Sequence, residues 1–81
     1  MSRATVSAED LLSILNAALV QVAECAGCRF VGAVERRADP YPDGGNWTRS
    51  LVVRGRPSDP HACGAAAADV IDDVARRYNL G

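Results

Sequence analysis

The 81-residue sequence contains no lysine, one histidine, one methionine and four aromatic residues, and it has no long apolar run. Because a membrane-spanning helix needs about 20 consecutive apolar residues, the sequence predicts no membrane span. A single histidine, without paired carboxylates on one face or a glycine-rich phosphate loop, provides no recognisable set of catalytic groups. We therefore expect a protein that is not an enzyme and that needs no cofactor.

Charge is distributed unevenly along the chain. The net charge is only −1, which by itself favours neither a nucleic-acid binder nor an acidic tail. All nine cationic residues are arginines, whose planar, weakly hydrated side chains suit interfaces. Residues 29–56 hold six of these arginines against three acidic residues. The middle of the chain is therefore basic, whereas both flanking segments are acidic.

Each flanking segment has helical periodicity. The first covers residues 7–25 and begins at Ser7, whose hydroxyl is a good N-cap for the free N–H groups of a first turn. Its leucines gather in one arc at 100° per residue, whereas Asn16 and Val20 fall on the opposite, solvent side. Residues 1–6 are expected to be disordered.

The second helical segment covers residues 60–79. Asp59 is the expected N-cap, and Pro60 suits the first helical position, where a backbone N–H has no partner in any case. Apolar residues again recur at helical spacing along the segment. We expect this helix to bury its apolar face against the same core as the first.

Between the helices, two runs of alternating apolar residues flank a loop of turn formers, which is the pattern of a β-hairpin. Strands are expected over residues 28–37 and 47–54, with a loop over 38–46. The prediction is one small α+β domain in the order αββα, with both helices on one face of a two-stranded antiparallel sheet. The alternative places one helix on each face.

The register of the hairpin follows from its apolar pattern, because a slip of one residue would turn one apolar set outward. The chosen register also avoids placing Arg36 opposite Arg49, which a shift of two residues would do. Its pairs are Phe30 with Val53, Val31 with Val52, and Arg36 with Trp47.

The face of the hairpin away from the helices carries Val31, Ala33 and Val52 in this arrangement. A two-stranded sheet with an apolar outer face and two free edges is not stable alone. A chain of this length also buries only about 60–65% of its unfolded surface. A second copy could pair face to face, covering these three residues, or edge to edge, extending the sheet, and a different partner is the alternative. We expect a homodimer built on the hairpin.

The loop and its flanking side chains form a candidate site for a further macromolecular partner, since long loops often carry function. A protein partner is the preferred interpretation. Nucleic acid is the alternative, because arginines contact phosphates and aromatic rings stack on bases. The residues predicted to meet the partner are Arg36, Arg37, Tyr41, Trp47 and Arg49.

The αββα order resembles the double-stranded-RNA-binding domain, which would imply phosphate contacts from the start of the second helix. The predicted sheet has two strands, however, and lacks the third that this family has. The second helix opens with HACGAAAADVIDD, which has no lysines and places acidic residues where phosphate contacts would be needed. The resemblance is therefore one of element order.

The cysteines allow three interpretations, of which a thiol–disulfide role for the Cys25-x-x-Cys28 motif is the least favoured, because Cys25 lies at a helix C-terminus, where the dipole disfavours thiolate. Three cysteines, with Glu9 and Asp10 where an export signal would be basic, argue against a disulfide framework and for a cytoplasmic protein. Small buried thiols are the preferred interpretation. A zinc-stabilised module is the alternative, although its His-x-Cys half is tighter than usual zinc spacing. The ligands of such a site would be Cys25, Cys28, His61 and Cys63.

Overall fold

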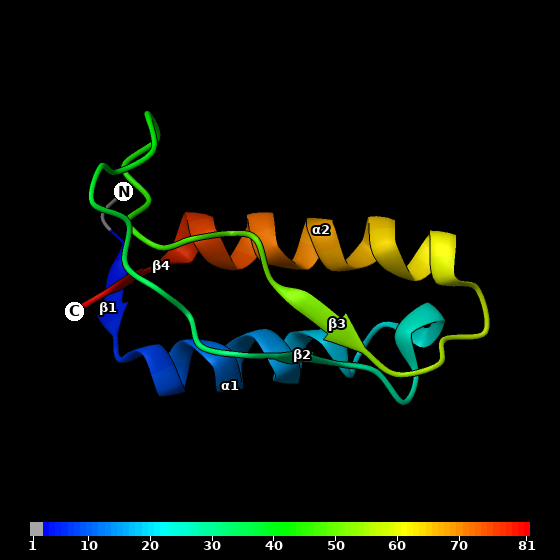
Figure 1. Ribbon diagram of the computed structural model, residues 1–81. Helices are drawn as coiled ribbons and strands as arrows, with labels where there is room; N and C mark the ends of the chain where they lie inside the picture. The colour runs from blue at the N-terminus through cyan, green and yellow to red at the C-terminus, as the bar shows by residue number, and fades with distance from the viewer. Residues whose placement is uncertain (1–2) are drawn as a thin grey trace.

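The computed structural model describes residues 3–81 (Figure 1). Helices and strands alternate in an α+β arrangement, and a strand is present at each end that the predicted αββα order lacks. The elements are β1 (Ala4–Val6), α1 (Ala8–Leu19), the short 3-10 helix η1 (Ala23–Cys25), β2 (Arg29–Val31), β3 (Val52–Arg54), α2 (Pro60–Arg77) and β4 (Tyr78–Leu80).

The two helices lie side by side and run in opposite directions, and the β2–β3 hairpin lies over one side of the pair (Figure 1). Phe30, Val34 and Trp47 on the inner face of the hairpin are buried. Val52 on its outer face has 59% of its surface exposed. The alternative with one helix on each face is therefore excluded.

The ends of the described chain meet in a second, parallel sheet. Ala4 pairs with Tyr78 and Val6 with Leu80, so part of the segment expected to be disordered is a strand. Met1 and Ser2 lie outside the described residues. The predicted helix over 60–79 was also too long, because Tyr78 adopts extended backbone with φ −136° and ψ 145° in order to pair with β1.

Both predicted helix starts are confirmed. The Ser7 hydroxyl accepts a hydrogen bond from the Asp10 N–H, and the Asp59 carboxylate accepts one from the Ala62 N–H. Helix α1 ends at Leu19, several residues before the predicted end at residue 25. Extended backbone at Val22 then separates the helix from η1, which lies against α2.

The predicted hairpin register is confirmed at all three pairs, but the strands are much shorter than expected. Near the loop, the Thr48 N–H donates to the Glu35 carbonyl at 2.8 Å. In an uninterrupted ladder Ala33 and Ser50 would form the next hydrogen-bonded pair. Among residues 3–81, however, no backbone hydrogen bond joins Ala33 to Ser50, which lie between β2 and the Arg36–Trp47 bridge. The ladder opens here because Gly32 has φ +95°, which diverts the strand.

The core lies between the helix pair and the inner face of the hairpin. Its largest fully buried side chains come from every layer of the fold: Trp47, Phe30, Leu11, Leu15, Leu19, Val74 and Cys25. No helix of residues 3–81 has the length and apolar composition needed to cross a bilayer.

A disulfide joins Cys25 in η1 to Cys63 in the first turns of α2, with the two Cα atoms 5.0 Å apart. The expectation of small free thiols was therefore wrong for two of the three cysteines. An odd count leaves one cysteine over, here Cys28, but does not prevent the other two from meeting. The zinc alternative is also overturned in this state, because two of its four ligands are bonded to each other.

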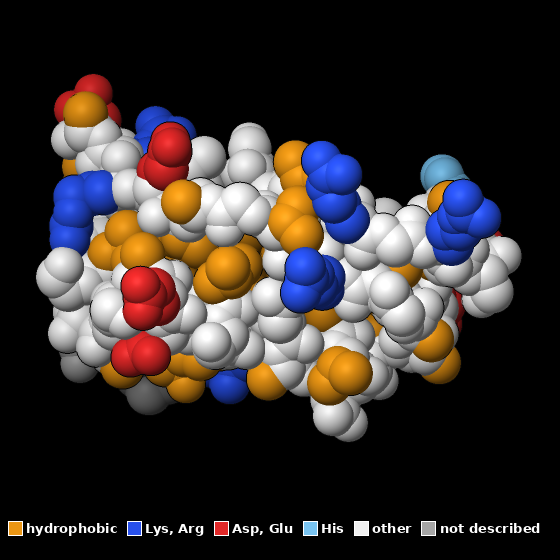
Figure 2. Space-filling view, turned by 60° about the horizontal axis from the view of Figure 1, so that its bottom comes forward, with side chains coloured by type: hydrophobic (Ala, Val, Ile, Leu, Met, Phe, Trp, Pro, Cys, Tyr) orange, Lys and Arg blue, Asp and Glu red, His pale blue; other side chains and the backbone are white. Residues whose placement is uncertain are grey.

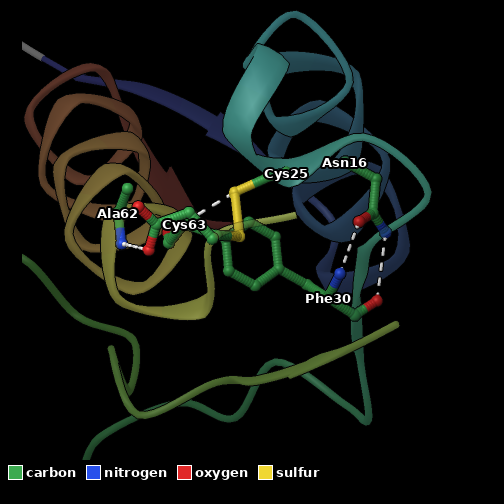
Figure 3. Close-up of a disulfide and its surroundings, with 6 residues drawn as sticks. Asn16, Cys25, Phe30, Ala62 and Cys63 are labelled. Carbon is green, nitrogen blue, oxygen red and sulfur yellow. Dashed lines mark hydrogen bonds between the residues drawn. A yellow bond between two sulfur atoms is a disulfide. The ribbon is translucent and has the colours of Figure 1, made fainter. Parts of the chain in front are cut away.

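Asn16 on α1 is the side chain whose predicted exposure was wrong. Its Oδ1 accepts a hydrogen bond from the Phe30 N–H at 2.7 Å, and its Nδ2 donates to the Phe30 carbonyl at 3.2 Å (Figure 3). These are the backbone groups of β2 that point away from β3. One amide therefore takes the place of a third strand and attaches α1 to the edge of the hairpin.

We predict that Asn16→Ala lowers the free energy of unfolding by about 1–3 kcal/mol, because both partly buried groups of Phe30 lose their partners. Urea denaturation monitored by circular dichroism measures the change. Ser13→Ala, an exposed substitution on the same helix, is the matched control and should shift stability by less than about 0.5 kcal/mol. Equal stability of the two variants would contradict the role given to Asn16.

Candidate functional site

Trp47 is not available to a partner. Its side chain is fully buried, and its indole N–H donates to the Tyr78 carbonyl at 3.0 Å. The prediction that it faces a partner was therefore wrong. The alternation of side chains along the strand had placed Trp47 on the same inner face as Leu51 and Val53, and this pattern correctly predicts that Trp47 is buried.

The loop over 38–46 is attached to β4 by two asparagines that sequence reasoning missed. The Asn46 side chain accepts from the Leu80 N–H at 2.8 Å and donates to the Leu80 carbonyl at 3.0 Å. Asn79 in β4 makes two further hydrogen bonds to the loop: its Oδ1 accepts from the Asn46 N–H and its Nδ2 donates to the Gly44 carbonyl. No local sequence pattern links residues more than 30 positions apart, so this contact had no signal.

Asp43 is the electrostatic centre of the loop. Arg49 donates to both of its carboxylate oxygens, at 3.0 and 2.9 Å, and Arg3 lies 3.6 Å away. The Gly45 N–H donates to the same carboxylate at 2.9 Å. This backbone hydrogen bond, and then Arg49, lower the pKa of Asp43 below its ordinary value of 3.8. Arg49 is thus neutralised within the loop.

The remaining candidate side chains of the loop are also engaged. The guanidinium carbons of Arg37 and Arg49 lie 3.9 and 4.2 Å from the ring centroid of Tyr41. Hydrogen bonding by Arg37 and by the Arg49 N–H lowers the pKa of Tyr41. Arg36 donates to the Gly81 carbonyl. The structure thus brings the candidate residues together, but in contacts with one another and with the chain ends.

The outer face of the hairpin carries a different arrangement. Residues that face outward from the two strands form successive cross-strand rows, which change from basic through apolar to acidic along the hairpin. Starting at the end away from the loop, the paired rows are Arg29 with Arg54 and Val31 with Val52. Ala33 and Ser50 follow where the ladder is open and line the hollow between the strands. Glu35 with Thr48 forms the last row, joined by the Thr48 N–H to Glu35 carbonyl hydrogen bond.

The first row is electrostatically unfavourable. Arg29 and Arg54 are exposed and paired directly across the strands, and like charges in this position repel. Neither guanidinium has an ion-pair partner among the residues that the structure describes. An acidic group from outside would relieve this repulsion.

The middle of the outer face is hollowed where the ladder opens. A depression of about 230 Å³ lies between the strands and is lined on one side by Val31, Gly32, Ala33 and Glu35 and on the other by Thr48, Ser50, Leu51 and Val52. A second hollow of about 270 Å³, lined by Leu12, Ala33 and Glu9 among others, adjoins it over α1. Figure 2 shows apolar side chains gathered on this side of the molecule, with acidic side chains in its left part and arginines at both its left and its right.

No family model, curated protein or solved structure matches the chain.

The function therefore rests on the two surfaces described above. In the loop, the predicted residues are used to hold the fold together. On the outer face, Val31, Ala33 and Val52 lie in the two central rows, and Val52 and Ala33 are exposed. Of the two candidate surfaces, the outer face has the more groups without partners.

We predict that Asp43→Asn destabilises the protein at pH 7 and that this destabilisation becomes smaller as the pH falls below 3.8. A depressed pKa means that the carboxylate stabilises the fold above pH 3.8, its ordinary pKa value, and that this stabilisation is lost as pH falls through the lower, folded-state pKa. Urea unfolding of both proteins at each pH measures the difference. A difference that is independent of pH would contradict the contribution of the charge. Asp39→Asn, an exposed acid of the same loop, serves as the control.

Proposed function

We propose that the protein is a non-enzymatic interaction module that forms a homodimer through the outer face of its hairpin. The observation that carries the proposal is the order of the cross-strand rows, basic, apolar and acidic. A surface ordered in this way is complementary to itself when a two-fold axis turns it end to end. The interface would then be isologous, with the same residues contributed by both copies.

The spacing of the rows supports a specific alignment. An axis midway between the Val31 and Ala33 rows sets the arginine row of one copy over the Glu35 row of the other. The same axis sets the Val31–Val52 row over the hollow beside Ala33 and Ser50, so that an exposed valine fills a depression of about 230 Å³. Apolar burial and charge pairing therefore favour the same alignment.

The disulfide bears on where such a module works. Disulfides persist in oxidising compartments and are rare where glutathione and thioredoxin keep thiols reduced. The buried Cys25–Cys63 bond therefore supports an oxidising compartment, in place of the cytoplasm that the sequence predicted.

Nucleic acid is the second candidate, and one observation favours it. Arg29, Arg54 and Arg56 are exposed and have no hydrogen-bonded acceptor among residues 3–81, so phosphates could bind them. The base-stacking part of this hypothesis is weakened because Trp47 is buried. Protein association is preferred because it also uses the apolar rows.

We predict that the wild type is a dimer at about 100 µM and that Val52→Glu weakens dimerisation by roughly 100-fold or more, because an unpaired buried carboxylate costs at least about 3 kcal/mol. Sedimentation equilibrium measures both constants. Val20→Glu is the matched control, since Val20 is even more exposed, at 69%, but lies on α1 outside the rows. A monomeric wild type, or equal weakening by both variants, would contradict the proposal.

Charge reversal tests the alignment. We expect Arg54→Glu to weaken the dimer, because it removes a cation from above Glu35 of the second copy, and Glu35→Arg added to it to restore part of the affinity. No restoration would show that the rows do not face each other in this order. Nucleic-acid binding would be indicated instead if Arg54→Glu left the dimer intact and abolished a salt-dependent gel shift.

A further inference from the structure

The Cys25–Cys63 disulfide is closed to solvent. Its two cysteines have only 1% and 3% of their surfaces exposed, and it joins η1 to the start of α2 with the Phe30 ring beside it (Figure 3). A dissolved thiol attacks a disulfide by direct contact with a sulfur atom. Such a thiol therefore has no direct path to this bond in the folded protein.

The third cysteine follows Cys25 by three residues and is more accessible. Cys28 is a free, half-buried thiol, and it packs against the same core cluster that contains Cys25 and Cys63. It is thus the one free thiol among residues 3–81.

A tight turn holds Cys28 close to Cys25. The Cys28 N–H donates to the Cys25 carbonyl at 2.9 Å, with φ −55° and ψ 129° at Ala26 and φ +80° at Gly27. These are the angles of a type II turn, which needs glycine at its third position and brings its first and last Cα atoms within about 7 Å. Disulfides form across Cα separations of up to about 7 Å, so Cys25 is within bonding reach of Cys28 as well as of Cys63.

We propose that the three cysteines form a thiol–disulfide exchange site in which Cys28 transfers the disulfide between two partners of Cys25. The Cys28 thiolate attacks the Cys25 sulfur, a Cys25–Cys28 bond forms, and the Cys25–Cys63 bond breaks. Cys63 leaves as a thiolate and takes up the proton that Cys28 released. The step is an isomerisation, so it needs no external oxidant or reductant.

Exchange changes what the disulfide holds. In the Cys25–Cys63 state the bond ties the first turns of α2 to η1 across 38 positions of sequence. In the Cys25–Cys28 state it closes only a four-residue turn, and α2 keeps its place by packing alone. Cys28 therefore gives external thiols and disulfides of the surroundings a route to a bond that controls one end of the fold.

Reduction of the wild type and of Cys28→Ser by dithiothreitol tests the proposal. Tryptic peptides 4–29 and 55–76 are linked in the Cys25–Cys63 state, and alkylation followed by mass spectrometry shows when they separate. We expect Cys28→Ser to be reduced more slowly, by on the order of tenfold, because the external thiol must then wait for local opening. During reduction the wild type should also show peptide 4–29 with an internal disulfide while Cys63 is alkylated.

Equal reduction rates of the two proteins would overturn the proposal. If Cys28→Ser fails to form the Cys25–Cys63 bond, the peptide analysis of the wild type alone tests the proposal. Detection of the internally bridged peptide 4–29 then supports the exchange, and its absence throughout reduction overturns it. Because dimerisation is measured separately, failure of the exchange leaves the proposed interface unaffected.

Discussion

The rest of the fold depends on the burial of Trp47. Its side chain is fully buried, it pairs with Arg36 across the hairpin, and its indole N–H donates to the Tyr78 carbonyl of β4. One residue therefore fixes the hairpin register and attaches the hairpin to the terminal sheet. With this inner face against the helices, Val52 must face outward because side chains alternate along a strand. The open outer face is thus a consequence of how the core is closed.

Features that depend on neighbouring residues were predictable. Ser7 and Asp59 were recognised as caps because a cap needs only a side-chain oxygen within three residues of a free N–H. The register was predictable because a period of two leaves few ways to keep Phe30 and Val53 on one face. The position of Trp47 followed from the same period, but its aromatic character led to its assignment to a partner. Burial should have taken precedence there.

Features that depend on distant residues were not predictable. The parallel pairing of β1 with β4 joins two three-residue segments from opposite ends of the chain, and such short strands have no periodicity to detect. Asn16 is polar and lies off the apolar arc, yet its partner is the backbone of Phe30, which no side-chain pattern reveals. The Cys25–Cys63 bond likewise requires the placement of η1 against α2, which spacing and cysteine count do not determine.

The central claim is that the outer face of the hairpin binds the same face of a second copy. The most direct measurement is an isotope-filtered nuclear Overhauser experiment on a mixture of labelled and unlabelled protein at about 1 mM, which detects only contacts between copies. We expect intermolecular cross-peaks from the methyl groups of Val52 and Val31 to Ala33 and Ser50. Intermolecular cross-peaks confined to Val20 and its neighbours, or none at all, would contradict it.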